Sequence, residues 1–211
     1  MYVPSHFEET RTDVMHALIR AHGLGTLVTL DDSGLNANHI PFEIEAEGAG
    51  AGEFGVLRAH VARANPVWKN LSSTVDAMVV FQGAQAYITP SWYETKKADG
   101  KVVPTYNYIS VHAYGELRAI DDRAWLRQFV GRLTDRYEAS RTAPWAVSDA
   151  PEEYIEKLLG AIVGIEIPIK RLVGKWKVSQ NRPAADRVGI IDGLTEAGSD
   201  DARAMARAVG R

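Results

Sequence analysis

The feature that most constrains the fold is a pair of β-rich runs joined by a tight turn near the N-terminus. Residues 26–30 (TLVTL) are rich in β-branched side chains, Asp31 to Gly34 has turn composition, and residues 35–45 alternate as a returning strand does. Strands joined this closely must be antiparallel, because parallel neighbours need a crossover of a dozen or more residues. The sheet therefore starts with a hairpin and not with a strand–helix–strand unit.

The remaining pattern extends this antiparallel arrangement. Strand-like runs cover about 53–61, 75–89, 104–120 and 161–173, and helical spacing covers 5–22, 122–137 and 151–159, with an exposed loop at 96–103. Because strands and helices do not alternate regularly, we predict an α+β fold that is mainly β, an antiparallel barrel with peripheral helices. Residues 183–211 carry few large apolar side chains, so we expect domain 1–182 to be followed by a helical or partly loose tail.

Composition excludes several classes of site. The 211 residues include no cysteine, which rules out disulfides, thiolate metal sites and a cysteine nucleophile. No apolar run approaches the ~18–20 residues that span a bilayer, and no secretory leader is visible, so a cytoplasmic protein without membrane contact is expected. The formal net charge of −3 gives no general attraction to nucleic acid.

One polar segment, residues 58–68 (RAHVARANPVW), combines groups that suit a phosphate. On a strand, Arg58 and His60 share a face, and Arg63 and Asn65 follow at the turn. Two guanidinium groups, an imidazole and an amide could together hold a phosphate dianion, which favours bidentate arginine donors. A solvated strand end with arginines in surface pairs is an equally good reading of the spacing.

Two other segments stand out. Residues 87–93 (YITPSWY) and 103–108 (VPTYNY) gather aromatic rings beside small polar groups, which suits a flat ring pocket, although plain core packing is the commoner use. Residues 174–182 (GKWKVSQNR) place Lys175 and Lys177 on one face of an extended backbone. Those lysines fit a phosphate, a nucleic-acid backbone or simply a solvated edge.

Common catalytic and nucleotide motifs are missing from the sequence. There is no GxGxxG fingerprint, phosphate loop, GxSxG elbow or HExxH motif, and the six histidines lack metal-ligand spacing. We therefore predict no metal site and assign no catalytic residue, while a lone histidine still leaves a haem ligand open.

Ordered blocks of this chain resemble the PaiB-type family of FMN-binding negative transcriptional regulators. The matching blocks are residues 1–7 (MYVPSHF), 38–42 (NHIPF), 60–68 (HVARANPVW), 83–88, 90–93 (PSWY), 103–108 (VPTYNY), 111–115 (VHAYG) and 175–181 (KWKVSQN). They follow the family order from the first residue to about 182. Tyr106 stands where tryptophan is expected, which keeps an aromatic ring there.

The resemblance implies a flavin split barrel that binds FMN at a homodimer interface. It strengthens the reading of Arg58, His60, Arg63 and Asn65 as a phosphate cluster. It further implies that the backbone of Asn38, His39, Ile40 and Pro41 borders the isoalloxazine, that Thr105, Asn107 and Tyr108 lie near the ring or ribityl chain, and that Lys175 and Lys177 come from the partner subunit.

Activity stays open at this point. The resemblance favours a transcriptional regulator, with DNA as a possible partner, and the basic residues best placed for DNA are Lys170, Arg171, Lys175, Lys177, Arg182 and Arg187. Split barrels also include flavin reductases, pyridoxamine phosphate oxidases and haem-degrading proteins, so the fold alone cannot choose. With flavin bound, the protein needs to supply only position and electrostatics.

Overall fold

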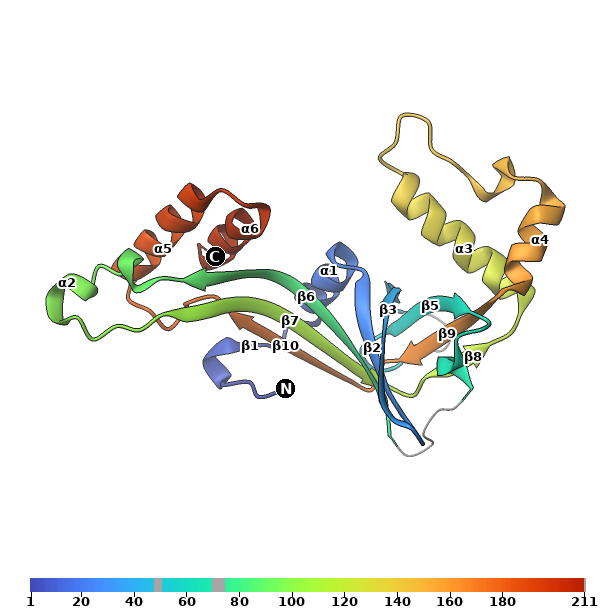
Figure 1. Ribbon diagram of the computed structural model, residues 1–211, viewed down its shortest axis with the longest axis horizontal. Helices are drawn as coiled ribbons and strands as arrows, with labels where there is room; N and C mark the ends of the chain where they lie inside the picture. Colours follow the sequence, from blue (N-terminus) through green and yellow to red (C-terminus); the bar gives the residue numbers. More distant parts are fainter. Residues whose placement is uncertain (48–50, 70–74, 211) are drawn as a thin grey trace. The chain divides into compact units, whose positions relative to one another are not determined.

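The computed structural model describes residues 1–47, 51–69 and 75–210. The chain forms two compact units, each made of separate stretches of sequence. Unit 1 comprises Met1–Leu18, Phe81–His112 and Val173–Arg211, and unit 2 comprises Ile19–Val80 and Ala113–Leu172. Strands β6, β7 and β10 each have residues in both units (Figure 1).

Strands and helices follow one another along the chain as irregularly as the sequence predicts. The strands are β1 (Glu8–Glu9), β2 (Leu24–Asp31), β3 (Gly34–Pro41), β4 (Glu43–Glu45), β5 (Val56–Ala62), β6 (Ala77–Ile88), β7 (Thr105–Gly115), β8 (Arg118–Ile120), β9 (Ile162–Pro168) and β10 (Arg171–Lys177). The helices are α1 (Thr12–Ala21), α2 (Lys96–Asp99), α3 (Arg123–Glu138), α4 (Glu152–Gly160), α5 (Ala184–Ala197) and α6 (Asp200–Val209). None of the helices formed by the described residues is long and apolar enough to cross a membrane.

The predicted hairpin is confirmed in unit 2. Strands β2 and β3 pair antiparallel over their whole length, from Leu24 opposite Pro41 to Asp31 opposite Gly34. A second sheet has the strand order β4-β5-β9-β8, and its ladders are also antiparallel. Helices α3 and α4 lie beside β9 (Figure 1). The ring of Trp125 covers the backbone of Gly164. Glycine is needed there because a Cβ atom would overlap the indole.

In unit 1 the sheet runs in the order β1-β10-β7-β6, with β1 and β10 antiparallel. Helices α5 and α6 pack beside these strands (Figure 1). Their buried side chains join a core with strand and loop residues: Ile88, Tyr93, Ile109, Val178, Ile190, Leu194, Met205 and Val209. Apolar burial of this kind is the main stabilising contribution in a small domain.

Five predicted elements differ from the structure. The strand expected over 35–45 divides into β3 and β4, and the strand expected over 104–120 divides into β7 and β8. The helix expected over 5–22 starts only at Thr12, because Glu8 and Glu9 pair with Lys175 and Gly174 of β10. The strand expected over 161–173 divides after Pro168 into β9 and β10, as the missing proline N–H favours. The loop expected over 96–103 contains the single turn of α2. The domain boundary at 182 stays a prediction.

Candidate FMN site

Strand β3 and the turn after β5 meet through a chain of amide groups in unit 2. The Nδ2 atom of Asn65 donates to Oδ1 of Asn38 at 2.8 Å, and Nδ2 of Asn38 donates to Oδ1 of Asn36 at 2.9 Å. The Oδ1 atom of Asn65 accepts from the backbone N–H of Val67 at 3.0 Å, which caps the short helical turn Pro66–Trp68. These contacts bring together two of the residues predicted to border FMN, Asn38 and Asn65.

The rest of the predicted β3 segment continues the hairpin. The Nδ1 atom of His39 lies 3.1 Å from the hydroxyl of Thr26, its cross-strand neighbour. Ile40 is buried, and Pro41 ends the strand exposed to solvent. His39 and Pro41 thus remain on the accessible side of the strand, while Ile40 belongs to the core.

Arg58 and His60 share one face of β5, as predicted from the period of two. The other face, with Leu57, Ala59 and Val61, is buried. The guanidinium of Arg58, however, is held by two carboxylates, at 2.6 Å from Nε to Oε1 of Glu166 and through Nη1 to Glu45. Its side chain is only 12% exposed, so this charge is compensated inside the fold.

Arg63 is fixed by a different set of acceptors. Its Nη1 and Nη2 atoms form a bidentate pair with Asp121 at 2.8 and 2.5 Å, and it donates to the carbonyls of Gly160 and Ile162. The hydrogen bond from Arg63 lowers the pKa of Asp121. Arg58 and Arg63 therefore each have carboxylate partners of their own, and the structure does not bring their guanidinium groups onto a common acceptor.

His60 is the predicted residue with an unused polar atom. Its Nδ1 is buried and has no hydrogen-bond partner among the described residues. The ring meets Phe129 of α3 edge-on, with 5.9 Å between centroids. Burial lowers the pKa of His60, so the imidazole is neutral near pH 7. A buried polar atom without a partner is costly, and a ligand that supplied a hydrogen bond would relieve that cost.

In unit 1, the predicted residues of β7 and β10 are brought together. The ammonium of Lys177 donates to Oγ1 of Thr105 at 2.7 Å and to the carbonyl of Tyr106 at 2.8 Å. Burial and, to a smaller extent, the neighbouring charge of Lys175 lower the pKa of Lys177. A lowered lysine pKa means that the surroundings under-stabilise its positive charge.

Lys175 lies on the same face of β10, two residues before Lys177. Its side chain is buried, and Nζ donates to the carbonyl of Tyr2 at 3.0 Å while facing the ring of Tyr108, 5.1 Å from its centroid. Neither lysine forms an ion pair with any carboxylate in the ranges the structure describes. Two neighbouring ammonium groups thus have only neutral partners.

Asn107, unlike the two lysines, contacts a neighbouring turn of the same unit. It is buried and donates from Nδ2 to the hydroxyl of Ser179 at 2.9 Å. Ser179 has a φ of 63°, in the left-handed region that non-glycine residues seldom adopt. This contact joins β7 to the turn after β10.

The donors of unit 1 differ from those of unit 2 in how their charge is compensated. A phosphate dianion needs cationic donors whose charge is not already neutralised, and the Lys175–Lys177 pair meets that condition. Arg58 and Arg63 would meet this condition only after breaking their ion pairs with Glu45, Glu166 and Asp121. The hydroxyl of Thr105 and the ring of Tyr108 add a polar group and a flat apolar surface beside the lysines.

Sequence reasoning did not find the carboxylates that hold the arginines. Glu166 lies directly opposite Arg58 in the β5–β9 register, and Glu45 and Asp121 come from other parts of unit 2. Only the pairing register of β5 and β9 could have revealed the Glu166 contact. Within the described parts of the chain, no three histidine or acidic side chains gather as metal ligands would.

Comparison with known proteins identifies the family. A family profile described as "Putative FMN-binding domain" matches residues 1–171. The chain belongs to this FMN-binding family. FMN is accordingly its cofactor, as the sequence resemblance implies.

Relatives of nearly the same length support this assignment. The Bacillus subtilis protein "Protease synthase and sporulation protein PAI 2" is 29% identical over 206 residues, which cover 98% of this chain and 95% of the relative. The Emericella nidulans protein AN0679 is 37% identical over 241 aligned positions, covering 99% of this chain and 96% of the relative. The predicted resemblance to the PaiB type is thus confirmed.

Solved structures confirm the fold class. The flavocytochrome Anf3 from Azotobacter vinelandii superposes with a TM-score of 0.59 at 14% identity, over 83% of this chain and 72% of that one. The FAD and heme binding protein from Mycobacterium smegmatis gives a TM-score of 0.59 at 18% identity, over 91% and 80%. At these identities the likeness concerns the fold alone, which is of the flavin-binding split-barrel type with peripheral helices.

Proposed function

We propose that Lys175 and Lys177 hold the phosphate of FMN, with Thr105 and Tyr108 beside them. The observation that carries this proposal is the pair of neighbouring ammonium groups, which have no carboxylate partner among the residues that the structure describes. A bound phosphate would compensate both charges, and the hydroxyl of Thr105 could donate to a phosphate or ribityl oxygen. We propose that the ring is bordered by Asn38, His39 and Pro41, which lie on β3. The same role is proposed for His60 on β5 and for Asn65 in the turn after β5.

The second part of the proposal concerns how the protein acts. We infer that it is a flavin-dependent negative regulator that works without direct sequence-specific contact to DNA. The regulatory role is suggested by the PaiB-type relatives, among them the Bacillus protein named for protease synthesis and sporulation. When bound, FMN supplies electron transfer, and the chain contributes binding, orientation and exclusion of water.

The state of the basic residues argues against a DNA-binding surface. Each of the six candidates is engaged within the chain. Their partners are Asp76 for Lys170, the ring of Tyr114 for Arg171, the Tyr2 carbonyl for Lys175, Thr105 and the Tyr106 carbonyl for Lys177, the ring of Tyr93 for Arg182, and the Val209 carbonyl for Arg187. DNA affinity depends on cations that are available to phosphates. Asp76 neutralises Lys170, and Lys175 and Lys177 are proposed to hold the phosphate of FMN, so less positive charge is left for DNA.

A flavin-dependent oxidoreductase is the second candidate, because FMN itself supplies redox chemistry when bound. A nicotinamide would have to approach the flavin directly, because the sequence has no dinucleotide-binding fingerprint. No side chain is assigned as acid or base for such a reaction. A homodimer and a cytoplasmic location complete the proposal.

One set of experiments separates these possibilities. The visible spectrum of the purified protein, with and without added FMN, distinguishes bound flavin from haem. A mobility-shift assay on upstream regions of its own genome is then run beside a nicotinamide-oxidation assay. We expect only weak, salt-sensitive shifts, with log K falling by about 0.9 per phosphate contact and log unit of salt. A sequence-specific shift at physiological salt would overturn the indirect mechanism, and sustained nicotinamide turnover would make the protein an oxidoreductase.

A further inference from the structure

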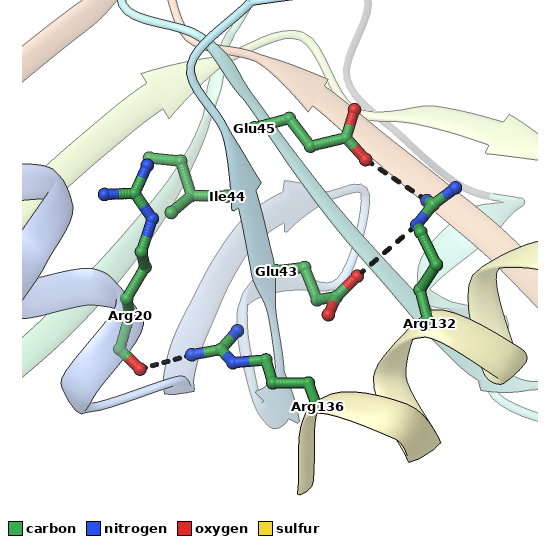
Figure 2. Close-up of a pocket in the computed structure, with 6 residues that line it drawn as sticks. All are labelled: Arg20, Glu43, Ile44, Glu45, Arg132 and Arg136. Atoms are coloured by element: carbon green, nitrogen blue, oxygen red, sulfur yellow. Dashed lines mark hydrogen bonds and ion pairs between the residues drawn. The ribbon is translucent and has the colours of Figure 1, made fainter. Parts of the chain in front are cut away.

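Unit 2 contains a pocket of about 240 Å³. Its lining includes none of the residues predicted to bind the flavin. It is lined by Arg20, Glu43, Ile44, Glu45, Arg132 and Arg136, from the end of α1, from β4 and from α3 (Figure 2). Pockets for drug-sized ligands usually have volumes of about 300–1,000 Å³. This one therefore suits a small molecule or a single functional group.

The two carboxylates of the pocket already have cationic partners. Glu45 accepts from Nη2 of Arg132 at 3.2 Å and also pairs with Arg58. Oε2 of Glu43 lies 3.9 Å from Nε of Arg132, which is an ion pair without a close hydrogen bond. Burial raises the pKa of Glu43, and the charges of Arg132 and Arg136 oppose that rise. Arg132 thus serves both glutamates.

The other two guanidinium groups have no such partner. Arg136 donates from Nη2 to the backbone carbonyl of Arg20, near the end of α1 (Figure 2). The Arg20 side chain lines the pocket together with Ile44. Across the residues for which the structure gives contacts, no carboxylate pairs with Arg20 or Arg136. The lining therefore carries three guanidinium groups against two carboxylates.

We propose that this pocket binds a small oxyanion, the phosphate or carboxylate group of a small molecule, through Arg20 and Arg136. Guanidinium groups match planar or tetrahedral oxyanions with paired donors, and a second arginine adds charge and direction. Arg136 is held in position by its bond to the α1 carbonyl, so one donor is prearranged. Glu43 opposes the anion electrostatically and competes for Arg132. The site is separate from the residues proposed for FMN and does not depend on that assignment.

The test is calorimetric titration of the full-length protein with inorganic phosphate and, separately, with acetate. Chloride keeps the ionic strength constant, so that general screening does not change. We expect saturable binding of at least one of the two anions, and the stronger of them identifies the source of the oxyanion. Absence of saturable binding for both anions overturns the proposal.

Two variants of pocket residues should change the anion affinity in opposite directions. Arg20→Gln removes a guanidinium but leaves the backbone carbonyl that holds Arg136, and it should weaken the anion roughly ten- to a hundredfold. Glu43→Gln removes the opposing charge with little change of shape, and it should strengthen binding about threefold or more. A strengthening cannot arise from simple loss of folding, so this variant keeps the test decisive.

A control variant defines where the anion binds. The titrations use protein saturated with FMN, so that the proposed phosphate site at Lys175 and Lys177 is already filled. Arg207→Gln changes an exposed arginine of α6 that does not line the pocket, and it should leave phosphate and acetate affinity unchanged. Equal weakening by Arg20→Gln and Arg207→Gln would show general charge attraction only and would refute the pocket.

Discussion

Arg58 and Glu166 are direct cross-strand neighbours on β5 and β9, and the Nε atom of Arg58 lies 2.6 Å from Oε1 of Glu166. Both side chains are largely buried, at 12% and 14% exposure. Glu45 pairs with the same guanidinium from the other side. The strand register thus places a cation between two carboxylates inside the second sheet.

Replacing Arg58 by methionine should destabilise the protein. Arg58→Met leaves the largely buried Glu166 with unpaired charge and leaves Glu45 with Arg132 as its remaining partner. Removing one partner of a buried pair costs about 3 kcal/mol or more. Denaturant unfolding measures this change. The double variant Arg58→Met/Glu166→Leu should recover part of the loss, since it removes one stranded carboxylate. A double variant no more stable than the single one would contradict the pairing as the cause.

FMN should bind more tightly than riboflavin, which lacks the phosphate. Each charge-assisted hydrogen bond contributes about 1.5–3 kcal/mol, so Lys177→Gln should weaken FMN roughly ten- to a hundredfold. Fluorescence titration with both flavins measures the difference. The same variant should leave riboflavin affinity nearly unchanged, because the lost amine has no phosphate to meet.

Arg63→Gln is the matched comparison for Lys177→Gln. Arg63 is already paired with Asp121, so its loss should affect FMN less than the loss of Lys177. If Arg63→Gln weakens FMN more strongly than Lys177→Gln, the phosphate lies at the arginine cluster of β5 and not at the lysine pair of β10.

Stability should fall as the pH is lowered through the ordinary range of histidine titration. Burial lowers the pKa of folded His60, whereas in the unfolded chain it titrates near about 6.5. Below that pH the unfolded state binds a proton that the folded state does not. The contribution of His60 to the free energy of unfolding is therefore present above the unfolded-state pKa and is lost as the pH falls below it. His60→Gln should lose less unfolding free energy than the native chain between about pH 7.5 and about pH 5.5. Equal losses would remove His60 as the cause.

Two helical glycines should respond to alanine in opposite directions. A Cβ at Gly193 of α5 would overlap the indole of Trp92, so Gly193→Ala should cost about 1–3 kcal/mol by overpacking. A Cβ at Gly131 of α3 meets nothing within 4 Å, so Gly131→Ala should gain about 0.5–1 kcal/mol from helix propensity. Thermal unfolding compares the two. No loss at Gly193 would mean that α5 packs loosely on unit 1.

The protein should sediment as a dimer of the 23.2 kDa chain. Tyr87, Val103 and Tyr106 of unit 1 are 56%, 66% and 47% exposed, an apolar set that a second copy could cover. Sedimentation velocity at micromolar concentration measures the mass. A stable monomer that still holds flavin would exclude a shared flavin site.

Local patterns were enough to predict most of the fold. The β2–β3 hairpin follows from two β-rich runs and a turn, and α3 begins where Asp122 caps the backbone N–H of Trp125. The start of α1 could not be read in this way. Helical spacing over 5–22 predicts an earlier start, but pairing of Glu8 and Glu9 with a strand more than 160 residues later overrides it. Long-range pairing of this kind leaves no local signal.

The sequence was enough to predict which types of residue form the candidate site, but not which residues they contact. Alternation along a strand correctly put Arg58 with His60 and Lys175 with Lys177. Which cations are neutralised depends on neighbours across the sheet, such as Glu166 for Arg58, and so on register. Burial in α6 was equally hard to predict from the sequence. Because this helix is rich in alanine, its composition did not indicate that Met205 and Val209 would be fully buried.

The amide chain from Asn65 through Asn38 to Asn36 has a direction. Each Nδ2 donates to the next Oδ1, and the first Oδ1 accepts from the N–H of Val67, so neither Asn65 nor Asn38 can turn over without breaking two bonds. At the outer end, the Oδ1 of exposed Asn36 accepts from this chain, and its Nδ2 points away from that bond. The orientation of an exposed amide on β3 is thus set by one backbone N–H three residues along the relay.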